Sequence, residues 1–160
     1  MDIYQTPPGD LCAAMREAAD RDCVAQQYAE NFATLFEQIV PNLRTAIEAG
    51  MTLADAIVHV HLQTLHAFPD SLIARKCGIT VAEEASRRAG EVLAAGPQPS
   101  AAYQQALQML DRYLRDERHQ RNPGTTADLL AAGLFTLLRD GIIEDAQAFN
   151  KRVHYADQPH

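Results

Sequence analysis

Residues 121–129 read Arg121-Asn122-Pro123-Gly124-Thr125-Thr126-Ala127-Asp128-Leu129 and combine a turn with the start of a helix. Pro123 fixes its own φ and restricts Asn122 to extended conformations, because the proline ring crowds the residue before it. Gly124 permits a turn that a side chain would obstruct. Thr125 or Thr126 can then cap the helix that follows.

The helix predicted over residues 126–139 is apolar on nearly every side, so we expect it to be buried near the centre of the fold. Its first turn offers free backbone N–H groups and the carboxylate of Asp128, and Arg121 lies just before it. Such a turn could hold a phosphate or a metal-bound phosphate. By spacing alone, an ordinary capped helix with an acidic first turn is the commoner explanation.

The composition suits one globular domain over residues 1–160, since 47% of the residues are hydrophobic and 22% are charged. The net charge of -7 argues against nucleic acid or an anionic membrane as a partner, because both need a basic face. An anionic substrate would therefore need a local cluster of cations.

Three cysteines without CxxC spacing indicate neither a disulfide framework nor a zinc site, and they fit a reducing cytoplasm. No apolar run reaches the roughly 20 residues that span a bilayer. We therefore expect a cytoplasmic protein that contacts no membrane.

Apolar residues recur at helical spacing along most of the chain, and strand patterns are missing. The predicted helices cover residues 10–19, 20–40 (ending at Pro41), 42–49, 52–67, 70–77, 80–95, 101–116, 126–139 and 144–153. The expected fold is an all-α bundle of seven to nine helices around the helix at 126–139. His59, His61 and His66 lack the i, i+4 spacing of a helical zinc site, so we expect no metal there.

A second polar turn lies at residues 69–76, where Asp70 or Ser71 is expected to cap a helix. Arg75 and Lys76 follow within two turns. An arginine fork beside a lysine point charge suits a polyphosphate. A basic last turn that complements the helix dipole explains the two cations equally well.

Together the two turns resemble motifs of the triphosphoribosyl-dephospho-coenzyme A synthase family. Residues 122–129, followed by a small-residue apolar helix, resemble the family's C-terminal signature. Residues 69–76, which run on into 81–84, resemble its Asp-containing segment that ends in Arg-Lys. The similarity covers residues 10–142.

The resemblance implies an ATP-binding transferase that joins the triphosphoribosyl group of ATP to dephospho-CoA or a related acceptor and releases adenine. It also implies Mg²⁺ as a cofactor, because the triphosphate is strongly anionic. By residue type and motif match, we predict catalytic and metal-binding roles for Asp70 and Asp128. Substrate-binding roles are predicted for Arg75, Lys76, Arg121, Asn122, Thr125 and Thr126.

The chain resembles the second half of such an enzyme, since it lacks the family's Gly-rich segment with a Thr-His-Lys-Gly-like motif. The alternative is therefore a non-catalytic or incomplete helical half that binds nucleotide, a separate N-terminal-half chain or another copy of itself. Some family members are associated with methanopterin-dependent one-carbon metabolism, where the acceptor is less defined.

Overall fold

The computed structural model describes residues 10–115 and 118–143, and every regular element within them is helical. The elements are α1 (Leu11–Ala18), α2 (Cys23–Ala29), the π-helical turn η1 (Leu35–Ile39), α3 (Val40–Glu48), α4 (Leu53–Ala67), α5 (Ser71–Cys77), α6 (Ile79–Ala94), α7 (Ala101–Leu114) and α8 (Gly124–Arg139). The predicted all-α bundle of seven to nine helices is confirmed. The helix predicted at 144–153 lies outside the described residues.

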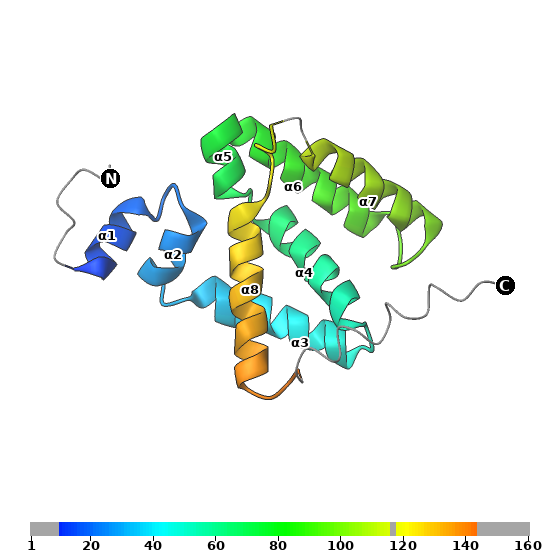
Figure 1. Cartoon of the computed structure of the whole chain (residues 1–160), viewed down its shortest axis with the longest axis horizontal. Helices are drawn as coiled ribbons and strands as arrows, with labels where there is room; N and C mark the ends of the chain where they lie inside the picture. The colour runs from blue at the N-terminus through cyan, green and yellow to red at the C-terminus, as the bar shows by residue number, and fades with distance from the viewer. Residues whose placement is uncertain (1–9, 116–117, 144–160) are drawn as a thin grey trace.

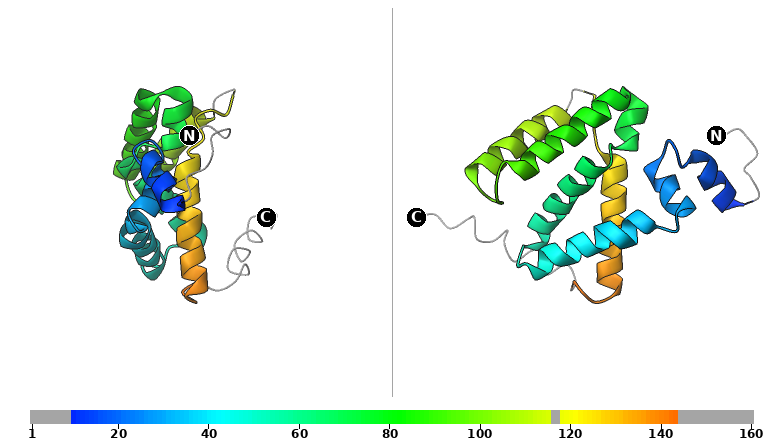
Figure 2. Two further views of the ribbon diagram at one scale, coloured as in Figure 1. Left: turned by 90° about the vertical axis from the view of Figure 1, so that its left-hand side faces the viewer. Right: turned by 180° about the vertical axis from the view of Figure 1, so that it is seen from behind.

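Helices α4, α6 and α7 form one side of the molecule, while α1 and α2 lie on the other side of α8 (Figure 1). Helix α8 packs against α2, η1, α3, α4 and α5. Its central place in the contact pattern agrees with the sequence prediction. The side view in Figure 2 shows that α8 nevertheless lies at one face of the molecule rather than in its middle.

The burial of α8 is one-sided, which corrects the prediction that it is buried all round. One face packs into the main core, and its buried residues are Thr125, Thr126, Leu129, Leu130, Gly133, Thr136 and Leu137. The other face leaves Phe135 65% exposed and Leu138 47% exposed. Apolar residues on every side of a helix therefore did not mean burial on every side here.

Gly133 allows α8 to approach η1 and α3 closely. A Cβ at this position would lie 2.8 Å from Cγ2 of Ile39 and 3.1 Å from Cδ1 of Leu43. The core beneath it consists of buried residues from η1, α3, α4 and α8, namely Leu35, Ile39, Val40, Leu43, Val60, Leu129, Leu130 and Leu137.

Several predicted helix starts are confirmed by their capping bonds. The side chain of Asp10 accepts a hydrogen bond from Cys12 N at 3.0 Å, and Thr52 Oγ1 accepts one from Asp55 N at 3.1 Å. Asp70 caps α5, as one of the two alternatives predicted. These bonds join residues two or three apart, so local sequence is enough to specify them.

The single helix predicted over residues 20–40 is wrong. Asp22 caps the short helix α2, and the chain then turns at Asn31 and Phe32, whose φ angles are 54° and 60°. Pro41 does not end a helix but lies in the first turn of α3, directly after the π-helical turn η1. The helical backbone runs on from η1 into α3, so the proline, which lacks an N–H to donate, stands directly after an irregular π-helical turn.

Candidate functional site

Asp70 joins the two turns that the sequence singled out. Its Oδ1 accepts hydrogen bonds from Leu72 N at 2.9 Å and Ile73 N at 3.1 Å, which caps α5. Its Oδ2 accepts two more, from Thr126 N and Thr126 Oγ1, both at 2.8 Å. One carboxylate therefore stabilises the N-terminal turns of two helices, although Asp70 and Thr126 are 56 residues apart.

A second link runs beside the first. Ser71 Oγ donates to Thr125 Oγ1 at 3.3 Å and accepts from Cys23 N at 3.1 Å. The starts of α2, α5 and α8 therefore meet at one place. We call the four residues Asp70, Ser71, Thr125 and Thr126 the Asp70 junction.

The first residues of α8 differ in role from the prediction. Neither threonine is the N-cap, because the helix begins at Gly124 and Pro123 precedes it without a side-chain capping bond. A Cβ on Gly124 would lie 2.5 Å from Cδ2 of Leu72, so glycine lets α8 start close against α5. The capping oxygen that local sequence could not supply comes from Asp70 instead.

The two helix starts do meet, and the anion between them is a side chain of the protein. Asp70 is only 1% exposed, and all four of its hydrogen bonds go to protein groups. Thr125 and Thr126 are also buried and bonded within the junction. Their predicted substrate contacts, and the metal contact of Asp70, stay predictions.

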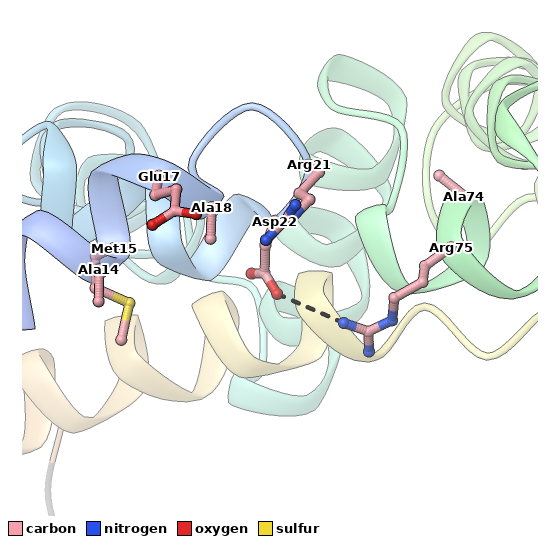
Figure 3. A pocket seen from close by; sticks show the side chains of 8 residues that line it. All are labelled: Ala14, Met15, Glu17, Ala18, Arg21, Asp22, Ala74 and Arg75. Atoms are coloured by element: carbon pink, nitrogen blue, oxygen red, sulfur yellow. Dashed lines mark ion pairs between the residues drawn. The ribbon is translucent and has the colours of Figure 1, made fainter. Parts of the chain in front are cut away.

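A cleft of about 600 Å³ opens beside the start of α2, as Figure 3 shows. Its lining comes from α1, the turn before α2, and α5, and consists of Ala14, Met15, Glu17, Ala18, Arg21, Asp22, Ala74 and Arg75. Asp22 caps α2 through Val24 N at 2.9 Å and also faces Arg75, with Oδ2 3.7 Å from the guanidinium.

The cations of α5 are oriented toward solvent. The side chain of Arg75 is 65% exposed, and Lys76 is exposed as well. A solvent-exposed ion pair such as that of Arg75 with Asp22 contributes little to stability, about 0–1 kcal/mol. Arg75 can therefore exchange its partner for an anionic ligand at low cost.

Arg121 has a structural partner in Tyr113. Its guanidinium carbon lies 4.6 Å from the centre of the Tyr113 ring, and Nη1 donates to the Tyr113 carbonyl at 3.2 Å. Arg88 lies over the same ring at 4.3 Å. This stack anchors the loop before α8, and the predicted phosphate contact of Arg121 stays a prediction.

Asn122 and Asp128 are both exposed. The carbonyl of Asn122 accepts a hydrogen bond from Gly124 N at 2.9 Å, which closes the turn before α8. Asp128 lies two residues beyond Thr126, on the solvent side of the same helical turn. Its carboxylate is therefore open to a ligand.

Sequence patterns did not single out His61 as a neighbour of the junction. Burial lowers the pKa of His61 from its usual 6.5, and the nearby carboxylate of Asp70 partly opposes that shift. The packing of α4 against α8, which also contacts α5, creates this environment, so no motif could have revealed it.

No group of three or more His, Cys, Asp or Glu residues able to hold a metal ion occurs in 10–115 or 118–143. The described residues therefore do not form a metal site from protein ligands alone. Mg²⁺ that arrives with a nucleotide needs only one or two carboxylates in addition to phosphate oxygens, and Asp128 fits that requirement.

The model of one protein family, ATP:dephospho-CoA triphosphoribosyl transferase, matches residues 2–146 of the chain. Both turns of the Asp70 junction lie within that range. No curated protein and no solved structure matches the chain. In the part of the chain described here, no helix has the length and apolar character needed to cross a membrane.

Proposed function

The chain belongs to the ATP:dephospho-CoA triphosphoribosyl transferase family, and from this membership we propose that it transfers the triphosphoribosyl group of ATP to dephospho-CoA or a related acceptor. Adenine is the leaving group. The observation that carries the proposal is the bond between Asp70 and Thr126, which brings both motif segments of the chain together.

The triphosphate would be held by the cations on α5. Arg75 offers a planar fork and Lys76 a mobile point charge; both are exposed on α5, and Arg75 lines the cleft at the start of α2. Arg21 lines the same cleft. A local group of three cations can bind a polyanion even though the chain as a whole carries a charge of -7.

Asp128 is proposed to bind the Mg²⁺ that accompanies the triphosphate, or to face the ribose. The ion would supply positive charge that neutralises the phosphate oxygens. Breaking the bond between ribose and adenine develops positive charge on the sugar, and a carboxylate placed beside it lowers the energy of that transition state.

Asp70 is proposed to act on the reaction by positioning. Its carboxylate fixes the starts of α5 and α8, so it sets the spacing between Arg75 and Asp128. A misplacement of about 1 Å can lower a rate a hundredfold, so rigidity at this junction matters even without a direct substrate contact.

The test is adenine release by the purified chain with ATP, Mg²⁺ and dephospho-CoA, measured by chromatography. We expect Asp128→Asn to lower the rate about a hundredfold. Arg75→Ala is expected to weaken ATP binding. Glu48→Gln is the matched control, because Glu48 is an exposed carboxylate at the end of α3, outside both motif segments, and should leave the rate unchanged. Full turnover by Asp128→Asn would refute the assigned role.

A second candidate function is a helical module that needs another protein surface to complete its site. The open apolar face of α8, with Phe135 65% exposed, favours it. In that case the folded chain alone would bind no ATP and release no adenine. Titration of the chain with ATP and Mg²⁺ separates the two candidates before any partner is sought.

A further inference from the structure

The outer face of α8 forms a continuous stripe. At 100° per residue, its exposed residues fall within an arc of about 120° on the helix. These residues are Ala127, Asp128, Ala131, Phe135, Leu138 and Arg139, and we call them the α8 stripe. In the side view of Figure 2 (left), no described helix lies on the outer side of α8.

The α8 stripe is ordered by size along the helix. Its N-terminal half carries the small residues Ala127 and Ala131, and its C-terminal half carries Phe135 and Leu138. A face of this kind is complementary to itself when two copies run antiparallel, because large side chains then meet small ones. In such a pairing Ala131 faces Phe135 of the second copy.

The two charged residues of the stripe also lie near its opposite ends. Asp128 lies near the start of the stripe and Arg139 at its end. An antiparallel pair places each Asp128 opposite Arg139 of the second copy. The three pairs 127/138, 131/135 and 128/139 have midpoints at position 133 or within half a residue of it, so one two-fold axis satisfies size and charge together.

We propose that the α8 stripe is the interface of a symmetric dimer, in which α8 packs antiparallel against α8 of a second copy of this chain. A parallel pair would instead set Asp128 against Asp128 and Phe135 against Phe135. An anionic membrane is a poor occupant, because the stripe has one acid and one base and the chain carries a net charge of -7.

The dimer bears on the proposed catalytic site. Asp128 lies at the edge of the stripe and two residues from the Asp70 junction. Arg139 of the second copy therefore adds a cation next to the carboxylate proposed to bind Mg²⁺ or ribose. Among the described residues Arg139 pairs with the exposed Asp140, at 2.8 Å, and such a pair is readily exchanged.

The experiment measures molar mass by sedimentation over a range of concentrations. We expect twice the 17.6 kDa of the single chain. Phe135→Lys should raise the dissociation constant about a hundredfold or more, because a central aromatic is buried on both sides of the axis. Met109→Lys is the matched control, since Met109 is 56% exposed on α7, and it should leave the mass unchanged. Circular dichroism checks that each variant is folded.

Charge reversal tests the antiparallel register. Asp128→Arg should weaken the dimer about tenfold, because two like-charge contacts replace two attractive ones. The double variant with Arg139→Asp should restore it. A wild-type chain that stays monomeric at every soluble concentration overturns the proposal, as does a dimer that Phe135→Lys does not weaken. A dimer without rescue in the double variant overturns the register. None of these readouts depends on catalysis.

Discussion

Removing the carboxylate of Asp70 tests the junction most directly. In Asp70→Ala, α5 loses its cap and the buried N–H of Thr126 loses its acceptor. Loss of an N-cap costs about 1 kcal/mol, and a buried donor left without a partner costs about 1–3 kcal/mol. The Thr126 hydroxyl also loses its acceptor, so we expect about 3–5 kcal/mol of lost stability in total.

The assay is urea unfolding followed by far-UV circular dichroism. Asp22→Ala is the matched control, because Asp22 caps only α2, through two hydrogen bonds in a half-buried setting. It should cost about 1 kcal/mol. If Asp70→Ala cost no more than Asp22→Ala, the carboxylate would not be what holds α5 and α8 together, and its positioning role would fall with it.

Two further predictions follow from the packing. Gly133→Ala should destabilise the fold by about 1–2 kcal/mol in urea unfolding, because the added methyl lies 2.8 Å from Cγ2 of Ile39 in a close-packed core. Gly90→Ala is the control for this variant, because the added methyl would meet the ring of His66, an exposed side chain that can move. An equal loss of stability in both variants would argue against the explanation by core packing. Burial lowers the pKa of His61 from 6.5, so its unfolded form binds a proton more readily than its folded form. The contribution of His61 to the free energy of unfolding should therefore be fully present above about pH 6.5 and decrease below it. His61→Gln should weaken this pH dependence, measured by unfolding at several pH values. An unchanged pH dependence would contradict the assignment.

The helix starts at Asp10, Thr52 and Asp70 could be predicted because each capping side chain bonds to an N–H two or three residues ahead. Such contacts form within one turn of the chain. The helix ends at Gly50 and Gly78 follow the same logic, since both glycines adopt positive φ, at 85° and 93°.

The turn at Asn31 and Phe32 could not be predicted, because neither glycine nor proline marks it. Phe32 adopts a φ of 60° while its ring lies 4.9 Å from the ring of Tyr28 and packs against the main core. The buried Gln27 side chain accepts a hydrogen bond from Leu35 N at 3.2 Å. Tertiary contacts stabilise a backbone conformation that the local sequence disfavours.

For the candidate site, sequence alone identified the residue types and both segments, at 69–76 and 122–129. It could not show that Asp70 caps α8 as well as α5, because a bond between residues 56 positions apart exists only once the helices have packed. It also could not show which side of α8 is covered. Helical periodicity determines which residues share a face, as it does for Asp128, Phe135 and Arg139, but only packing against η1, α3 and α4 decides which face of an apolar helix is buried.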